Sequence, residues 1–224
     1  MAREALLYDL QQSPACAKVR ICLQVKGVPY RRTTPTITDI LRDRPVPRLM
    51  LGERTLGSCD AIVRQLDVLW PEPPLAPRER EARAYSDLLE GWADASLAGA
   101  VRRLAWGPEA ERLRSARATA SEVAAGPLAW LLAAVLARRA AHLECTVEDA
   151  RARLREHLQV LDALLGDRPF LLGRTPTRAD FAAFAQLACA RRCGDELRLD
   201  PWPAVSAWLE RLDAMPAIGT ALAG

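Results

Sequence analysis

Histidine is nearly absent from this sequence, with two residues, His142 and His157, among 224, and aromatic residues make up only 5%. An excess of charge of one sign is also missing, because 31 Lys and Arg residues face 28 Asp and Glu residues. The two signs are interspersed along the chain, so the sequence contains no basic stretch of the kind that binds nucleic acid. We therefore expect no nucleic-acid partner.

Long hydrophobic runs are missing as well. The first ten residues, MAREALLYDL, contain no apolar segment and no cleavage site of the kind found in secretory signals. The longest apolar stretch, residues 127–137 (PLAWLLAAVLA), has about half the length needed to cross a bilayer. We predict that this stretch is a buried helix, that the protein does not associate with membranes, and that it is cytoplasmic.

Paired cysteines with the spacing of a zinc site are not found. Cys189 and Cys193 stand four residues apart on an expected helix, but the histidines are distant and no second pair exists. A chain of this length, with half its residues hydrophobic, does not need disulfides to build a core. We expect neither a metal nor a disulfide framework from the six cysteines, at positions 16, 22, 59, 145, 189 and 193.

The first seventy residues alternate between strand and helix patterns. Ser13 and Pro14 are a favourable cap and first residue for a helix, and Gly27 ends it. The predicted order is β-α-β-α-β-β-α, which gives a mixed sheet. The elements are a strand at 4–10, a helix at 14–26, a strand at 28–36, a short helix at 37–42, a hairpin at 48–51 and 54–56, and a helix marked by Ala61, Ile62, Leu66 and Leu69.

A proline-rich segment, residues 71–77, then interrupts the chain. Four prolines in seven residues favour a stiff, extended linker. The residues that follow have helical periodicity, so we predict two domains, at 1–72 and 78–224. Helices are expected near 78–105, 109–124, 127–142, 147–165, 178–192 and 203–213.

Four segments together resemble one known family. Residues 13–21 (SPACAKVRI) look like the S/C-P-x-x-x-[KR]-V-R segment that opens the first helix of the glutathione transferases. Residues 46–49 (VPRL) are similar to the family's V-P-x-L, and 177–180 (TRAD), after 170–173 (FLLG), to its C-terminal capping box. The resemblance, to the cytosolic glutathione S-transferases, implies a thioredoxin-like N-terminal domain with a mixed four-stranded sheet, followed by an all-helical domain. The ending from 202 to 218 is also typical of the family.

The resemblance implies that glutathione is the co-substrate and that Ser13 is catalytic. Its hydroxyl would lie beside the glutathione sulfur and stabilise the thiolate, helped by the positive end of the helix. Val46, before a cis-Pro47, would pair with the peptide backbone of glutathione like an added strand. Ser58 and Cys59 would lie by the γ-glutamyl end. Taken without the family, Ser13 is simply an N-cap.

Two features of these motifs leave alternatives open. Cys16, one helical turn after Ser13, would lie at the glutathione site as a reactive thiol or as a small packing residue. The family usually has Glu or Gln before the serine that precedes the third helix, whereas this chain has Ser58-Cys59 or, one register earlier, Gly57-Ser58. Asp60 is a candidate to replace the missing acid.

Other candidate residues have structural or substrate-binding interpretations. Thr177 and Asp180 form a capping box, and we assign them no catalytic role. The pocket for the second substrate would lie between the domains. Its candidate wall residues are Tyr85, Trp92 and Trp106, with Arg102 or Arg103 as the complementary charge.

These observations favour a transferase that adds the glutathione thiolate to a small, partly apolar electrophile, as in detoxification. One alternative is a glutathione-dependent thiol oxidoreductase using Cys16 or Cys59. Another is a non-catalytic binding protein with the same fold. We also expect a homodimer formed by the third helix and the first C-terminal helices, which carry Leu88, Leu89 and Leu97.

Overall fold

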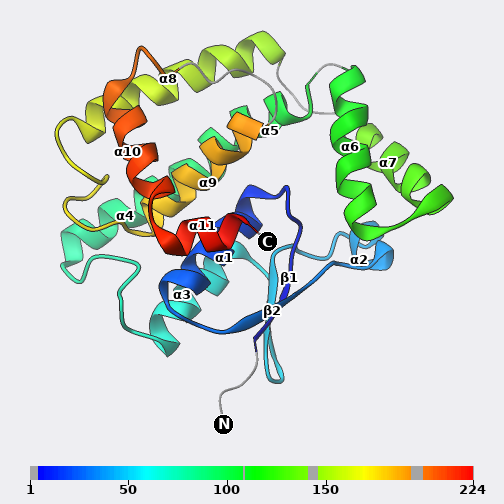
Figure 1. The fold of residues 1–224 in the computed structure, drawn as a ribbon, viewed down its shortest axis with the longest axis horizontal. Coiled ribbons are helices and arrows are strands. Elements are labelled where there is room, and N and C mark those ends of the chain that lie inside the picture. Colours follow the sequence, from blue (N-terminus) through cyan, green and yellow to red (C-terminus); the bar gives the residue numbers. More distant parts are fainter. Residues whose placement is uncertain (1–4, 108, 141–145, 193–198, 224) are drawn as a thin grey trace.

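The computed structural model describes residues 5–107, 109–140, 146–192 and 199–223. A small sheet with its helices occupies one end of the molecule, and a larger group of helices covers the rest (Figure 1). The expectations for His142, Cys145 and Cys193 concern residues outside the described ranges.

The sheet is mixed and four-stranded, as predicted, with the order β2-β1-β3-β4. Strand β1 pairs in parallel with β2 and antiparallel with β3, and β3 and β4 form the hairpin. The bounds of the hairpin match the prediction because Gly52, with φ of 62°, occupies its turn. The strands are β1 Ala5–Tyr8, β2 Tyr30–Thr33, β3 Arg48–Leu51 and β4 Arg54–Leu56.

Three helices belong to the sheet domain, and their starts follow the local sequence signals. Ser13 caps α1 and Ser58 caps α3, while Thr36 and Asp39 form a capping box at α2. Helices α1 and α3 pack against each other. Their bounds are α1 Pro14–Val25, α2 Ile37–Leu41 and α3 Cys59–Leu69.

The second part of the described chain is helical. Helix α9 lies at its centre and contacts α1, α4 and α5, so this helix joins the two parts of the molecule. The expected helix at 78–105 is interrupted by a π-helical segment, η1. The elements are α4 Arg80–Trp92, η1 Ala93–Leu97, α5 Ala98–Ala105, α6 Glu109–Val123, α7 Gly126–Ala140, α8 Val147–Leu165, α9 Arg178–Arg192, α10 Pro203–Asp213 and α11 Pro216–Leu222.

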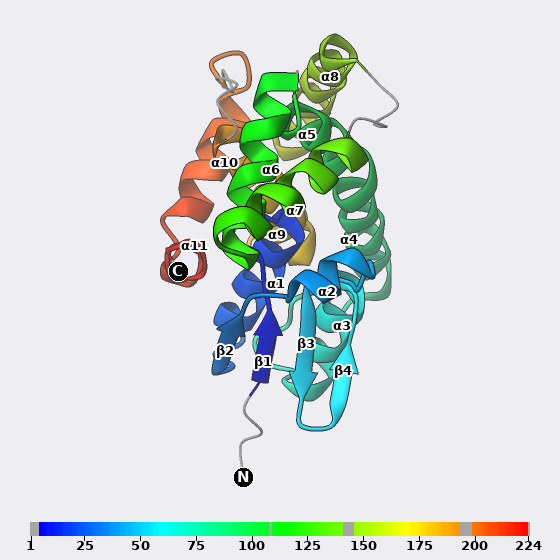
Figure 2. The ribbon, with the colours of Figure 1, turned by 90° about the vertical axis from the view of Figure 1, so that its right-hand side faces the viewer.

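The prediction of a buried helix at 127–137 was wrong in one respect. The stretch is helical in α7, but Leu128, Trp130 and Leu131 are 58%, 67% and 60% exposed. Helix α7 packs mainly against α6 and buries Leu132 and Ala133, so only one of its faces is covered (Figure 2). When apolar residues occur on all sides of a helix, the sequence does not indicate which face is buried against another helix.

Helix α11 was not predicted, although its first residues had been recognised as a family motif. In the described residues, no helix is both long enough and apolar enough to span a bilayer. The fold class is confirmed: a thioredoxin-like sheet domain is followed by an all-helical domain.

Candidate functional site

The structure brings three segments that carry candidate residues to one end of the sheet. The Cys59 thiol, at the start of α3, donates to the Ala15 carbonyl at the start of α1, 3.6 Å away. Gly57 lies against Pro45, since a Cβ at Gly57 would come within 3.0 Å of the proline Cγ. The Val46–Pro47 peptide bond, in the segment leading into β3, is cis, as the resemblance predicts. We call Ser13, Val46, Pro47, Ser58 and Cys59 the Ser13 site.

Ser13 caps α1 through its side chain. Its Oγ accepts from the Cys16 backbone N–H at 3.4 Å, and the Cys16 sulfur accepts from the Leu10 N–H at 3.4 Å. Cys16 is completely buried, and burial raises the pKa of its thiol to about 12. The thiol is therefore protonated at neutral pH, and it packs beneath the start of the helix.

Ser58 has the same role at α3, where its Oγ accepts from the Ala61 N–H at 3.2 Å. The neighbouring Cys59 is mostly buried, and burial raises the pKa of its thiol well above the usual value, although nearby Lys18 opposes the shift. Neither cysteine of the region is a thiolate at neutral pH, which lowers its reactivity as a nucleophile.

A buried lysine lies next to this region and joins the two domains. Lys18, in α1, is 1% exposed and bonds to Glu90 at 2.7 Å and Asp94 at 2.5 Å, while Asp60 is 3.6 Å away. Glu90 in turn forms an ion pair with Arg178 of α9, at 2.9 Å. The sequence motif singled out Lys18 only as a family residue, because its acidic partners lie 42 to 76 positions later.

Burial and the opposite charges compete in setting the pKa values of this cluster. Burial raises the pKa of Glu90 and of Asp94, and Lys18 partly reverses both shifts. Burial opposes the charge of Lys18 too, but the carboxylates of Asp94 and Glu90 raise its pKa above the ordinary value. The three carboxylates lie within 4.8 Å of one another, as in a metal site, yet the Lys18 ammonium already supplies the cation among them.

The loop that leads to Ser13, residues 9–13, is held by a second ionic cluster. Asp9 accepts from Arg20 at 2.6 Å and from Arg32 at 2.5 Å, and Arg20 is fully buried. Arg20 also donates to the Ala221 carbonyl of α11 at 2.8 Å. Gln11 accepts from Arg32 at 2.5 Å and donates to the Leu222 carbonyl at 3.2 Å.

Glu122, near the end of α6, holds the same loop from the other domain. Its carboxylate accepts from the backbone N–H of Gln11 at 2.6 Å and from that of Gln12 at 3.4 Å. The α6–α7 hairpin also packs on α2 through a small apolar cluster that includes Ile37 and Ile40. Sequence analysis missed Glu122, because a contact across 111 residues leaves no local pattern.

The residues suggested for the second-substrate pocket are not gathered together. Tyr85 is 53% exposed on α4, whereas Trp92 packs edge-on against His157, with the ring centroids 5.3 Å apart. Trp106 packs in the apolar cluster with α2, α6 and α7. Of the two arginines, Arg102 is exposed and Arg103 donates to the Gly107 carbonyl at 3.2 Å.

The structural interpretation of Thr177 and Asp180 agrees with the observed bonds. Asp180 accepts from the Thr177 N–H at 2.8 Å and from its hydroxyl at 3.0 Å. It also accepts from the Leu171 N–H and the Trp208 indole, each at 2.9 Å. The carboxylate therefore fastens α10 and the 170–173 turn to the start of α9.

Comparison with known proteins gives matches to both parts of the chain. The family model for the N-terminal domain of glutathione S-transferase matches residues 7–74, and that for the C-terminal domain matches residues 127–216. FtsZ-localized protein A from Caulobacter vibrioides is 27% identical over 100% of this chain and 92% of its own length. Glutathione S-transferase Z1 from Arabidopsis thaliana is 33% identical over 36% of this chain and 41% of its own length.

Solved structures show the same fold. A glutathione S-transferase from Rhodospirillum rubrum F11 has a TM-score of 0.76 and 23% identity, covering 98% of this chain and 92% of its own. The structure of FzlA from C. crescentus has a TM-score of 0.75 and 25% identity, covering 99% and 92%. With both family models matched in order on this fold, the chain belongs to the glutathione transferase superfamily.

Proposed function

We propose that the protein binds reduced glutathione at the Ser13 site and adds its thiolate to a small, partly apolar electrophile. One observation carries the proposal: the N-terminal ends of α1 and α3 and the segment before β3 lie together at one end of the sheet. We extend the proposal to a cytoplasmic role in detoxification.

Ser13 is the residue that would stabilise the thiolate. Its Oγ accepts one long bond from the Cys16 N–H, and its hydroxyl also interacts with the Cys16 side chain, which lowers the pKa of that thiol against the effect of burial. The hydroxyl proton would turn from the neutral Cys16 thiol to the charged glutathione sulfur, which is the stronger acceptor, and the α1 N-terminus adds a favourable partial charge. Positioning and charge stabilisation account for this mechanism without a covalent enzyme intermediate.

The other residues of the site would hold the peptide. Val46 offers backbone groups beside β3, and the N-terminus of α3 at Ser58 and Cys59 offers N–H groups to the γ-glutamyl carboxylate. Asp60 is partly exposed at the same helix start and is our candidate for contacting the ammonium group. Cys16 supports the site from below.

We also propose a homodimer through α3 and α4. Helices α3 and α4 are linked by an Arg64–Asp87 ion pair at 3.8 Å. Of the leucines suggested by the sequence, Leu88 is 70% exposed and Leu89 is partly buried. Leu97 is buried in the core of this chain and is not available to a second subunit. Exposed apolar side chains on these two helices are Val68, Leu69, Tyr85 and Leu88.

Sedimentation of Leu88→Asp should show monomers at concentrations where the wild type is dimeric, and a monomeric wild type would contradict the proposal.

Calorimetry with reduced glutathione and turnover of 1-chloro-2,4-dinitrobenzene test the transferase. Ser13→Ala should retain binding and lose about ten- to a hundredfold in turnover at neutral pH, the value of one charge-assisted hydrogen bond. The loss should shrink as pH rises and the thiolate forms unaided. Thr146→Ala removes a similar cap at α8, far from the site, and should leave turnover unchanged. Full activity in Ser13→Ala would refute the mechanism.

A second candidate function is binding without catalysis. It is favoured by the full-length similarity to FtsZ-localized protein A, whereas the thiol oxidoreductase alternative is weakened by the buried, protonated state of Cys16 and Cys59. Absence of heat with millimolar glutathione, together with co-sedimentation with FtsZ polymers from the same organism, would favour this candidate over the transferase.

A further inference from the structure

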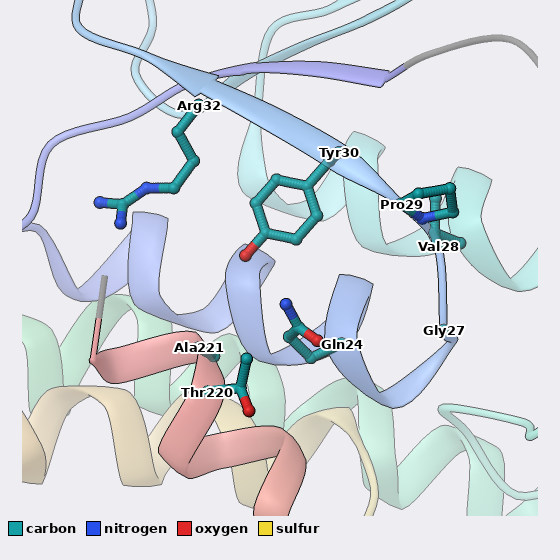
Figure 3. Close-up of a pocket in the computed structure, with 8 residues that line it drawn as sticks. All are labelled: Gln24, Gly27, Val28, Pro29, Tyr30, Arg32, Thr220 and Ala221. Carbon is teal, nitrogen blue, oxygen red and sulfur yellow. The ribbon is translucent and has the colours of Figure 1, made fainter.

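A pocket of about 520 Å³ lies at the opposite end of α1 from Ser13. It is bounded by the end of α1, by the edge strand β2 with the segment before it, and by α11 (Figure 3). We call it the Tyr30 pocket. Its lining residues are Gln24, Gly27, Val28, Pro29, Tyr30, Arg32, Thr220 and Ala221. None of them belongs to the Ser13 site.

Three polar side chains at this pocket have no hydrogen-bond partner among the described residues. They are the amide of Gln24, the hydroxyl of Tyr30 and the hydroxyl of Thr220, and they come from α1, β2 and α11. Figure 3 shows the Tyr30 ring extending from β2 toward α1, with Gln24 below its hydroxyl and Thr220 on the adjacent α11. Convergent polar groups in a partly apolar hollow are the usual mark of a small-molecule site.

The charge at the pocket favours an anion. Arg32 is its only charged lining residue. Its Nε and Nη2 bind Asp9 and Gln11, whereas Nη1 has no partner in the described part of the chain. Asp9 is shared with Arg20, so one carboxylate faces two guanidinium groups and the cluster keeps a net positive charge. Glu122, bonded to the nearby backbone, forms no ion pair with either arginine but adds a second negative charge to the region, so the unpartnered Nη1 of Arg32 is the group that would attract an anion.

The walls of the pocket favour an apolar body for the ligand. Pro29 supplies exposed aliphatic surface and the Tyr30 ring adds an aromatic face, whereas Val28 and Ala221 are 5% and 1% exposed and form the floor behind them. A volume of this size falls within the range of small-ligand pockets, which span roughly 300–1,000 Å³. An apolar chain or ring along these walls would bring an acidic group to Arg32 at one end of β2.

From these observations we propose that the Tyr30 pocket binds a small amphiphilic monocarboxylate, with the carboxylate on Arg32 and hydrogen bonds from Tyr30, Gln24 or Thr220. This site is separate from the Ser13 site and does not depend on glutathione binding. It is connected to the loop 9–13, however, because Arg32 and α11 are both bonded to that loop.

Octanoate and 1-octanol, which share an apolar chain and differ in charge, are suitable probes. They would be titrated into ¹⁵N-labelled full-length protein without glutathione, and amide shifts would be followed by NMR. We expect saturable octanoate shifts at Gly27, Tyr30 and Thr220, with smaller shifts at the bonded Gln11. Octanol should bind at least about tenfold more weakly, since it cannot pair with Arg32.

Matched variants separate the pocket from other surfaces. Tyr30→Phe removes one hydroxyl and should weaken octanoate binding about three- to tenfold. Tyr85→Phe makes the same change on exposed α4 and should have no effect. Shifts centred on Val46 and Ser58, equal affinities for the two probes, or unchanged binding in Tyr30→Phe would each overturn the proposal. The absence of saturable shifts at the pocket would also overturn it.

Discussion

The two ends of helix α1 differ in how completely their polar groups are satisfied. At the N-terminal end, the loop 9–13 is bonded to its own domain, to α6 and to α11, and Lys18 is enclosed by three carboxylates. At the C-terminal end, Lys26 is bonded to Asp67 and to the Trp70 carbonyl, but the side chains of Gln24 and Tyr30 have no partner in the described chain.

The two ends therefore represent two kinds of binding site, one with its polar groups already bonded and one with polar groups left for a ligand. The Ser13 end is preorganised by contacts from distant parts of the sequence, which suits a hydroxyl that must hold one position. The Tyr30 end keeps hydrogen-bonding capacity free for a ligand. The comparison makes a ranked set of stability predictions, because satisfied buried groups cost more to remove than unsatisfied ones.

The largest effect is expected from Lys18→Met. Removing one partner of a buried ionic cluster leaves uncompensated charge and costs about 3–5 kcal/mol of unfolding free energy. Urea denaturation measures this loss. Arg64→Met breaks the partly exposed Arg64–Asp87 pair and should cost less than about 1 kcal/mol. Similar losses of unfolding free energy in the two variants would contradict the expected difference between the buried cluster and the partly exposed pair.

The pH dependence of Lys18→Met sharpens the same test. Glu90 and Asp94 have folded-state pKa values above their ordinary values of 4.5 and 3.8. As pH rises through this window the unfolded chain loses these protons first, so the stability contribution falls. Without Lys18 both pKa values rise further. The variant should therefore be closer to wild type near pH 4 than at pH 7, and a constant difference would contradict the assignment.

Glu122→Ala should have the next largest effect, and a local one. It frees the N–H groups of Gln11 and Gln12, and a hydrogen bond to a charged group is worth about 1.5–3 kcal/mol. Hydrogen exchange at these two amides should accelerate about ten- to a hundredfold. Glu148→Ala, in the exposed first turn of α8, is the control and should leave both amides protected.

Ser13→Ala should cost about 0.5–2 kcal/mol, the usual value of an N-cap. The 3.4 Å bond to the Cys16 N–H is long, which places the expectation at the lower end of that range. Thermal unfolding monitored by circular dichroism measures it. A loss as large as that of Lys18→Met would mean that Ser13 has contacts beyond its cap.

Tyr30→Phe should have the smallest effect, within about 0.5 kcal/mol of wild type, because the lost hydroxyl bonds to no described residue. Chemical denaturation without added ligand measures this difference. A loss above about 1 kcal/mol would show that the hydroxyl is already satisfied, and the contrast between the two ends of α1 would disappear.

Local features of this fold were predictable and distant ones were not. The hairpin around Gly52 and the cap at Ser13 depend on neighbouring residues, so their patterns are visible in the sequence. The break at η1, the open face of α7 and the bond from Glu122 to Gln11 depend on packing between remote segments. For the candidate site, the sequence suggested which residues meet through family resemblance, but not what surrounds them.

The bond from Arg20 to the Ala221 carbonyl spans 201 positions of the chain. During synthesis, the hydrogen bond from the buried Arg20 guanidinium cannot form until residue 221 has been added to the chain. The hydrogen bond from Gln11 to the Leu222 carbonyl likewise forms only at the end of synthesis. The sheet domain therefore cannot complete its polar interior while it alone has left the ribosome. Its early form would be exposed to chaperones and proteases until α11 arrives, so the order of synthesis makes this two-domain protein mature as one unit.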